Sequence, residues 1–327
     1  MPSLSIRPFS EGDDLALGEI LHDAATPAEH VARNLFRPDG EQPLTRAVVA
    51  TIDNTEVVVG AAAIAESPAH PHRAWVHVEV ATEDRRRGVG RALLDAVRER
   101  VAGTSLEGLP LRARVSPGSD GQAAARAAGF HDLFRTRVVR VEPGTLAGLG
   151  AGREADFTVT ATGSVVLTQL FGEWYAGVNR VDPAAEMSVG AVNRRFLSEQ
   201  TGAHGAAILR RDGVPAGFAV SYAEPYTVDE ESAPSEEDEY PATELTLASL
   251  FDARRPGAAG AGAIDRESPE FQKALGDAAV LLASLSLETP VVVEVTSEMP
   301  VVTELVDGLL ESGQASVLYE YVTLALD

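Results

Sequence analysis

The fold of this chain is decided by the stretch Val76-His77-Val78-Glu79-Val80-Ala81-Thr82-Glu83-Asp84-Arg85-Arg86-Arg87-Gly88-Val89-Gly90-Arg91-Ala92-Leu93-Leu94. Its first five residues alternate valines with His77 and Glu79, which is the period-2 pattern of a strand with one apolar face. After Gly90 the apolar residues recur at helical spacing, as Leu93 and Val97 do, so an amphipathic helix is predicted to begin there. The stretch therefore predicts a strand, a tight basic turn and a helix.

The turn between these two elements is suited to an anion. Gly88 and Gly90 lack a Cβ, so a ligand can approach the main-chain N–H groups that the first helical turn leaves unpaired. The helix dipole and the guanidinium groups of Arg85, Arg86 and Arg87 also favour negative charge. These residue types predict a cradle for an anion, most naturally a pyrophosphate.

The spacing Arg-x-x-Gly-x-Gly at Arg85, Gly88 and Gly90 resembles the acyl-coenzyme A pyrophosphate loop of the GNAT acetyltransferase superfamily. The approach to the loop, Val80-x-Thr82-Glu83-x-Arg85, is similar to the family's Val-x-Pro-Glu-x-Arg. The dipeptide Gly129-Phe130 also falls where the family's Gly-Phe closes the next helix. The resemblance implies a GNAT fold and acetyl-CoA (coenzyme A) as the co-substrate.

The resemblance also implies which residues bind this co-substrate. Main chain at Val78 and Val80 would pair with the pantetheine arm like an added strand, with the Val80 N–H near the thioester carbonyl. The basic loop would hold the pyrophosphate. The predicted cofactor-binding residues are Val78, Val80, Arg85, Arg86, Arg87, Gly88, Val89, Gly90 and Arg91. No metal site is predicted.

Glu79 and His77 are the candidate general bases, because they share the strand face opposite the valines. Direct acetyl transfer needs a deprotonated amine, and either side chain could take the proton directly or through a water. A glutamate with a pKa raised by burial, or a histidine, suits this role at neutral pH. Two structural alternatives stay open: Glu79 can pair with an arginine, and His77 can be a hydrogen-bonded residue of the sheet.

The general acid is where the sequence departs from the family pattern. Many relatives carry an asparagine and a tyrosine at the positions of Gly118 and Ala125, and neither residue here can donate a proton from its side chain. Because the thiol of coenzyme A is a fairly good leaving group, an acid is not obligatory. The candidate substitutes are Ser116, Ser119, Tyr319 and Tyr321. The two tyrosines are more typical of strand packing.

The same order of elements recurs along the chain. Residues 1–145 predict a first unit that closes with two strands, at 132–137 and 138–143. Residues 146–156 are rich in glycine and small residues and predict a linker, and residues 157–327 repeat the order. We therefore predict an α/β (α+β) fold of two tandem GNAT-like units, each a mixed, mostly antiparallel central sheet flanked by helices.

The second unit is predicted to be degenerate. It contains Arg-x-x-Gly-x-Ala at Arg254, Gly257 and Ala259, but the next helix signal starts only at Ser268, and Pro256 removes one N–H from the turn. A working second site is the alternative. The tandem layout resembles that of mycothiol synthase, whose carboxyl-terminal copy is catalytic. In this chain the loop that fits the family pattern better is amino-terminal, so we do not assign the substrate of mycothiol synthase to it.

Composition restricts the partners. The net charge of −22 argues against nucleic acid, because binding phosphates needs surplus Lys and Arg. No apolar run reaches the roughly 20 residues of a membrane helix, and the absence of cysteine excludes disulfides and thiolate chemistry. We expect a soluble cytoplasmic protein with no nucleic acid or membrane partner; its oligomeric state is left open.

Together these features predict an acetyl-CoA-dependent N-acetyltransferase that acts on a small-molecule amine by direct acetyl transfer in the amino-terminal unit. One alternative is a non-catalytic acyl-CoA-binding or regulatory tandem GNAT protein that kept the anion cradle and lost its acid. A purely structural pair of degenerate units, which predicts no cofactor binding, is a third possibility. The sequence does not identify the acceptor amine.

Overall fold

The structure is a computed structural model that describes residues 4–52, 57–149, 151–153, 156–223, 242–254 and 264–327. The chain divides into two compact units. Unit 1 comprises residues 1–135 and 321–327, and unit 2 comprises residues 136–320. The sequence predicts boundaries at 145 and 156; in this division unit 2 begins at residue 136 and the last residues of the chain, 321–327, join unit 1.

Unit 1 is built on a mixed sheet in the order β1-β3-β4-β5-β6, followed by residues 322–326 of strand β13. The β5–β6 pair is parallel, and the other neighbours on this path pair antiparallel. Its elements are β1 (Leu4–Pro8), α1 (Asp13–Ile20), α2 (Pro27–Arg33), β2 (Gly40–Glu41), β3 (Leu44–Ile52), β4 (Val58–Ala65), β5 (Ala74–Val80), a 3₁₀ turn (Thr82–Asp84), α3 (Val89–Arg100), β6 (Leu111–Val115) and α4 (Asp120–Ala127).

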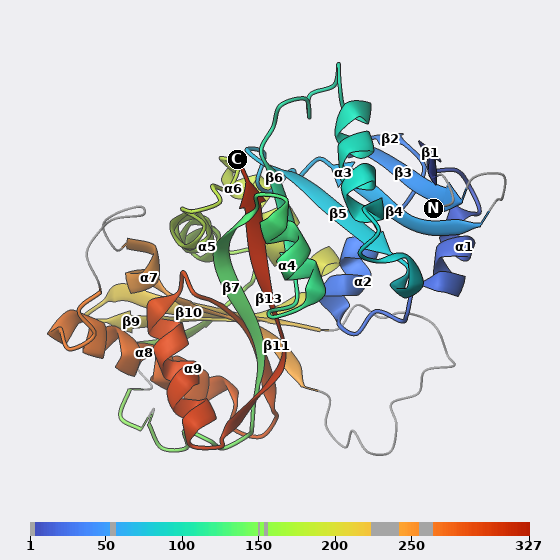
Figure 1. Cartoon of the computed structure of the whole chain (residues 1–327). Coiled ribbons are helices and arrows are strands. Elements are labelled where there is room, and N and C mark those ends of the chain that lie inside the picture. The colour runs from blue at the N-terminus through green and yellow to red at the C-terminus, as the bar shows by residue number, and fades with distance from the viewer. Residues whose placement is uncertain (1–3, 53–56, 150, 154–155, 224–241, 255–263) are drawn as a thin grey trace, which may run out of the picture. The chain divides into compact units, whose positions relative to one another are not determined.

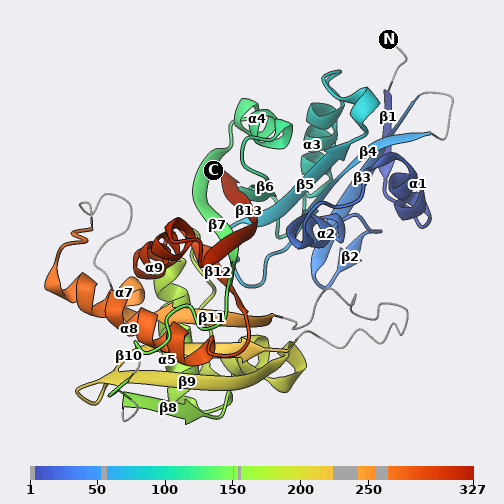
Figure 2. The same cartoon turned by 90° about the horizontal axis from the view of Figure 1, so that it is seen from below.

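Helices cover both faces of the unit 1 sheet. Helix α3 lies on one face and helices α1 and α2 on the other, as the two views show (Figures 1 and 2). Each face buries its own apolar cluster: Val76 and Leu93 belong to the cluster under α3, and Leu17 and Phe36 to the cluster under α1 and α2. The alternation of β5 therefore directs its valines towards α3 and His77 and Glu79 towards α2.

Local sequence signals set the helix starts. Thr26 caps α2 by accepting a hydrogen bond from the Glu29 N–H at 3.2 Å, with Pro27 at the first helical position. Ser119 caps α4 in the same way through Gln122. Helix α3 starts differently, because its N-cap is Gly88, with φ of 87° and no side-chain cap. Its first turn is therefore open to a ligand.

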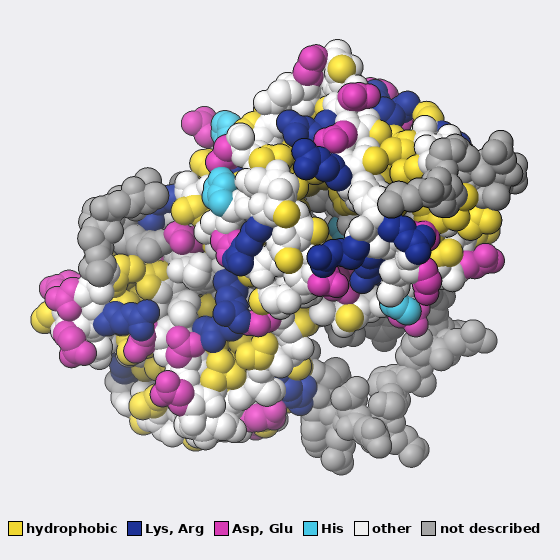
Figure 3. Space-filling model, viewed as in Figure 1, with side chains coloured by type: hydrophobic (Ala, Val, Ile, Leu, Met, Phe, Trp, Pro, Cys, Tyr) yellow, Lys and Arg dark blue, Asp and Glu magenta, His cyan; other side chains and the backbone are white. Residues whose placement is uncertain are grey.

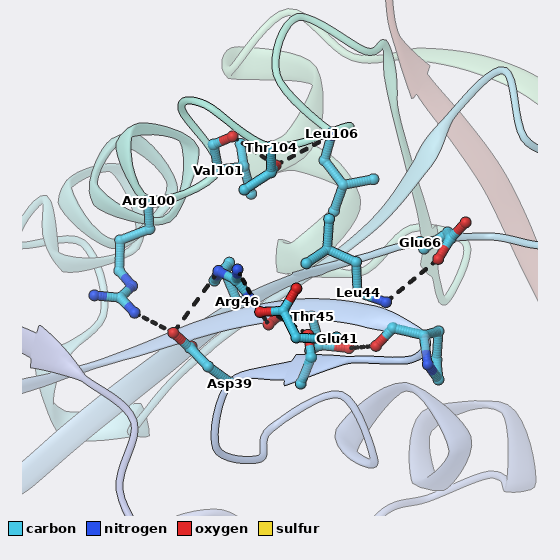
Figure 4. Close-up of polar contacts among 12 residues, drawn as sticks. Asp39, Glu41, Leu44, Thr45, Arg46, Glu66, Arg100, Val101, Thr104 and Leu106 are labelled. Carbon is cyan, nitrogen blue, oxygen red and sulfur yellow. Dashed lines mark hydrogen bonds and ion pairs between the residues drawn. The ribbon is translucent and has the colours of Figure 1, made fainter.

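The far end of α3 is tied to β3 by Asp39. The Asp39 carboxylate forms an ion pair with Arg100, the last residue of α3, and its Oδ2 lies 3.8 Å from Nε of Arg46 in β3 (Figure 4). Arg46 in turn pairs with Glu41 at 2.8 Å. This network fixes the carboxyl-terminal end of the helix over the sheet, so its amino-terminal turn is held where β5 ends.

Unit 2 repeats the order of unit 1. Its sheet runs β8-β9-β10-β11-β12 and is completed by residues 136–141 of β7, with β11–β12 as the parallel pair. Its elements are β7 (His131–Val141), β8 (Phe157–Thr160), α5 (Val165–Val178), α6 (Val189–Val192) with a π-helical turn (Asn193–Leu197), a 3₁₀ turn (Glu199–Thr201), β9 (Ala203–Arg211), β10 (Val214–Tyr222), β11 (Thr243–Ser249), α7 (Leu250–Arg254), α8 (Pro269–Leu285), β12 (Val291–Thr296), α9 (Pro300–Glu311) and β13 (Ala315–Leu326). Strands β7 and β13 each continue across the division between the units.

The two strands predicted at 132–137 and 138–143 are in fact one strand, β7, so that prediction is wrong. No glycine, proline or asparagine interrupts the run from Asp132 to Val141, and the chain has no local reason to turn there. The sequence pattern also predicts strands at 46–51, 243–250 and 291–296 and a helix from Ser268 to about Leu285, and the structure has each of these elements to within a few residues at its ends. The sequence also predicts a hairpin turn at Asp53-Asn54 and a solvated acidic loop at 226–240, and both lie outside the described residues.

A repeated glycine supports the internal duplication. Gly60 of β4 faces Val80, and Gly217 of β10 faces Ser249, the last residues of the corresponding strands. A Cβ at either glycine would lie 2.6 Å from a main-chain carbonyl oxygen, that of Glu79 or Ala248. Each glycine is next to a register shift, at which one residue of its strand is left out of the pairing. The close approach of two backbones thus recurs at the same place in both units.

Candidate active site

The centre of the site in unit 1 is the point where β5 and β6 separate. The two strands pair only at Ala74 with Leu111 and at Trp75 with Arg112 within the described residues. The Ala81 N–H donates to Val59 on the β4 side, whereas the Ala74 N–H donates to Pro110 on the β6 side. Because these directions alternate along a strand, the main-chain N–H and C=O groups of Val78 and Val80 point away from β4, towards the side on which β6 separates from β5.

The main chain of Val80 is only partly used by the protein. Its carbonyl oxygen accepts a hydrogen bond from Arg85 Nε at 3.0 Å, and its N–H faces the diverging side of β5. The structure thus places Val78 and Val80, which the sequence singled out, at a strand edge that β6 does not cover. An extended ligand could add to this edge by main-chain hydrogen bonds.

The basic loop follows directly. Gly88 has φ of 87°, and the N–H groups of Val89, Gly90 and Arg91 precede the first intrahelical bond, which runs from Ala92 to Gly88. A Cβ on Gly90 would make ordinary contacts, 3.6 Å from Val80 and 3.8 Å from Val78, so packing within the protein does not itself require glycine there. A ligand that lies against this turn would instead be the reason for a residue without a side chain at position 90.

The arginines of the loop have different roles. Arg85 binds the end of β5, and Arg87 pairs with Asp84 at 2.8 Å. Arg86 and Arg91 are exposed and form no ion pair with the described residues. Lys and Arg side chains gather beside the amino-terminal end of α3 in the space-filling view (Figure 3). Two of the predicted phosphate-binding arginines are thus free to meet an anion, and two also hold the shape of the loop.

On the opposite face of the sheet, α2 bridges the separating strands. Arg33, the last residue of α2, donates two hydrogen bonds to the Glu79 carboxylate of β5, at 2.9 and 2.6 Å. Glu29 of the same helix accepts a hydrogen bond at 3.1 Å from Ser116, which follows β6. Sequence reasoning did not find Arg33, because nothing in the sequence shows that α2 crosses β5.

His77 lies beside Glu79 on this face. Its Nε2 is 3.4 Å from Glu79 Oε2, and its ring centroid is 4.9 Å from that of Phe36. The side chains of His77 and Glu79 are 17% and 20% exposed, so both are largely shielded from water. The structure therefore brings the two candidate bases together and joins Glu79 to an arginine, which was one of the alternatives left open by the sequence.

The pKa of Glu79 is lowered, whereas a glutamate acting as the general base at neutral pH would need a raised pKa. Burial does oppose ionisation of Glu79, but hydrogen bonds from His77 and Arg33, together with their charges, outweigh burial and lower the pKa of Glu79 to about 2. A carboxylate held this firmly in its ionised form is a weak proton acceptor. Its geometry suits it better to orient His77 than to take the proton itself.

We expect Arg33→Met to weaken unit 1 most at neutral pH. The pKa of Glu79 is lowered from 4.5 to about 2, so the ion pair stabilises the fold above about pH 4.5 and is lost as pH falls towards 2. The variant leaves a buried carboxylate without its cation, at a cost of about 1–2 kcal/mol. Urea unfolding from neutral pH to about pH 3 should show this difference shrinking. Arg126→Met, which breaks an exposed pair with Asp132, is the control; a pH-independent difference would contradict the prediction.

The residues considered as general acids are engaged elsewhere. Ser119 Oγ donates to the Ser116 carbonyl at 2.6 Å, and Ser116 Oγ donates to Glu29. Tyr321 is buried, with the Arg114 guanidinium 4.7 Å from its ring, and Tyr319 belongs to unit 2. Each serine hydroxyl already donates its hydrogen within the protein, so neither can donate to a ligand in this arrangement.

The corresponding region of unit 2 differs. Strand β11 runs directly into α7, and Arg254 at the end of α7 pairs with Glu173 at 2.7 Å. Gly257 and Ala259, the rest of the second motif, lie outside the described residues. Arg254 is therefore committed to α5.

These features define a protein made of two repeated α/β units, one of which has an uncapped, arginine-rich helix start beside a separating strand pair. Residues 16–130 match the family model described as Acetyltransferase (GNAT) family. The matched residues make up most of unit 1, which identifies that unit as a GNAT acetyltransferase domain.

Solved structures agree with this assignment at the level of fold. A GCN5-related N-acetyltransferase from Sphaerobacter thermophilus is 13% identical with a TM-score of 0.54; the alignment covers 99% of this chain and 95% of that one. A fungal multi-domain GH3 β-N-acetylglucosaminidase with a GCN5-related glucosamine N-acetyltransferase region is 12% identical with a TM-score of 0.54, over 100% of this chain and 38% of that one. No curated protein matches the sequence significantly.

Two further observations concern other kinds of site. No helix within the described ranges is both long and apolar enough to cross a bilayer. Those same ranges contain no group of three or more His, Asp or Glu side chains arranged to hold a metal ion.

Proposed function

We propose that unit 1 is an acetyl-CoA-dependent N-acetyltransferase for a small-molecule amine. The observation that carries this proposal is the uncapped first turn of α3 next to the uncovered edge of β5. A pyrophosphate at this turn would meet the N–H groups of Val89, Gly90 and Arg91, while an extended arm could pair with Val78 and Val80. The residues present therefore fit acetyl-CoA, which would supply the acetyl group as an activated thioester.

The opposite face supplies the groups for proton transfer. His77 would accept the proton of the amine, and the Glu79 carboxylate, held by Arg33, would orient the imidazole and stabilise its charged form. The Val80 N–H lies where a carbonyl oxygen that gains negative charge could accept a hydrogen bond. Each of these groups belongs to the last four residues of β5, so one strand end would align both reactants.

A non-catalytic acyl-CoA-binding protein is the second candidate. It is favoured by the missing acid: Gly118 and Ala125 carry no donor, and the nearby Ser116 and Ser119 hydroxyls already donate within the protein. This candidate shares the cofactor-binding residues with the first. The two differ only in whether bound acetyl-CoA is consumed when an amine is supplied.

Calorimetric titration of acetyl-CoA tests the proposed site. We expect about one equivalent to bind to the wild type and binding to weaken at least tenfold in Arg86→Asn/Arg91→Ala, because two charge-assisted phosphate contacts are lost. Asn is chosen at 86 because Arg86 has φ of 63°, which asparagine tolerates. Gly90→Leu should also block binding, since helical side chains lean towards the helix start.

Three controls make the titration decisive. Arg98→Ala removes an exposed arginine at the other end of α3, and Gly276→Leu adds a side chain in α8 where a Cβ meets nothing within 4 Å. Arg254→Ala tests the second unit. Loss of binding in Arg254→Ala alone would move the site to unit 2, and no binding by the wild type would overturn the proposal. An amine screen on the binding-competent protein then separates enzyme from binding protein.

A further inference from the structure

The structure assigns to Arg114 a role as the recognition site for a carboxylate carried by the acceptor amine, an inference that rests on the proposed function of unit 1. Arg114 belongs to strand β6, which runs from Leu111 to Val115. Because Ala113 and Val115 face the cluster under α3, the side chain of Arg114 projects to the opposite face, where His77 and Glu79 also lie. The arginine and the candidate base thus share one face of the separating strand pair.

The guanidinium of Arg114 lies close to two aromatic rings. Its central carbon is 4.7 Å from the Tyr321 ring centroid and 4.9 Å from the Trp75 ring centroid, and the Arg112 guanidinium lies closer to the Trp75 ring, at 3.6 Å. A cation–π contact does not use the N–H donors of a guanidinium, so these donors stay available for hydrogen bonds. The arginine is therefore positioned in advance for a planar, two-oxygen acceptor, which is the geometry of a carboxylate.

No group in the described part of the chain satisfies those donors. Arg114 is half-buried, makes no ion pair there, and its Nε is buried without a hydrogen-bond acceptor. Two carboxylates of this face are already occupied, Glu79 by Arg33 and Glu29 by Ser116. A partly buried cation without an anion is unfavourable, so a ligand carboxylate would supply the missing partner.

The position of Arg114 also limits the length of the acceptor. Trp75, whose ring lies close to Arg114, is two residues from His77 on the same strand face, or roughly 7 Å along β5. A carboxylate on Arg114 and an amine near His77 are therefore separated by only a few bonds. The predicted acceptors are small amino acids, with the amine on the same carbon as the carboxylate or a few carbons away.

The test compares each acid with its amide. Glycine, β-alanine, 4-aminobutyrate and 5-aminopentanoate, and the carboxamide of each, are offered with acetyl-CoA while coenzyme A release is followed. We expect wild type to prefer an acid over its amide at least tenfold. Arg114→Met should raise the KM for that acid about 10- to 100-fold and leave the KM for the amide and the affinity for acetyl-CoA unchanged. Arg114→Lys should restore part of the preference, because lysine keeps the charge without the fork.

Further outcomes separate this inference from the proposed function. Arg98→Met is the matched control, as an arginine of the same unit outside the site. Binding of the same acids and amides to the coenzyme A-saturated protein is measured by calorimetry, so the result does not depend on turnover. Equal binding of acids and amides, or equal losses for both in Arg114→Met, would overturn the assignment of Arg114. Failure of the wild type to bind acetyl-CoA would instead overturn the proposed function.

Discussion

Gly60→Ala is expected to destabilise unit 1 by about 3 kcal/mol. The added Cβ would lie 2.6 Å from the Glu79 carbonyl oxygen and 3.1 Å from the Val80 Cα, both main-chain atoms of the neighbouring strand. A third neighbour, Leu93 Cδ1 at 3.3 Å, can rotate away, but the two backbone atoms cannot. Strand β5 would therefore have to move away from β4 at its functional end.

A matched set of glycine variants isolates this effect. Gly217→Ala should cost unit 2 a similar amount, since its Cβ would meet the Ala248 carbonyl oxygen at the same distance. Gly18→Ala in α1 and Gly276→Ala in α8 place a Cβ where nothing lies within 4 Å. These two helical changes should stabilise their units by up to about 1 kcal/mol.

The two tryptophans of the chain allow each unit to be followed separately. Trp75 lies in unit 1 and Trp174 in unit 2. Urea unfolding of Gly60→Ala is therefore measured by fluorescence in a Trp174→Phe background, and that of Gly217→Ala in a Trp75→Phe background. A loss below about 0.5 kcal/mol for Gly60→Ala would mean that the strands separate easily, contrary to the close approach of their backbones.

Most of the fold could be predicted from local sequence signals. The alternation of valines in β5, the Ser119 cap of α4 and the Ser268-Pro269 start of α8 each depend on residues that are neighbours in sequence. The single strand β7 was missed, and so was the transfer of residues 321–327 to unit 1. Both depend on which strand pairs with which, and local patterns carry no information on that choice.

The candidate site divides in the same way. The basic loop and the faces of β5 follow from spacing, so Gly88, Gly90, His77 and Glu79 could be named from the sequence. Arg33 and Arg114 could not, because their importance comes from contacts with residues more than 35 positions away. The direction of the Glu79 pKa was also beyond reach, since burial alone predicts a rise and only the contacts with His77 and Arg33 reverse it.

If unit 1 is the acetyltransferase that we propose, His77→Ala should lower kcat by about 10²- to 10⁴-fold, the usual contribution of a general base. The affinity for acetyl-CoA should not change, because His77 lies on the opposite face from the pyrophosphate turn. Rates are measured on an acetylated amine from the screen, under saturating acetyl-CoA. His131→Ala, which changes an exposed histidine beside Asp327, is the matched control and should keep the wild-type rate.

Glu79→Gln distinguishes the two candidate bases. Because the pKa of Glu79 is about 2, its carboxylate is ionised throughout the neutral range and would act mainly through His77. Its loss removes a negative charge 3.4 Å from His77 Nε2 that would orient the imidazole, so the rate should fall about tenfold. A fully inactive Glu79→Gln beside an active His77→Ala would reverse the assignment, because the carboxylate would then have to take the proton itself. The pairing of Glu79 with Arg33 argues against that outcome, since an arginine that stabilises the carboxylate also weakens it as a base.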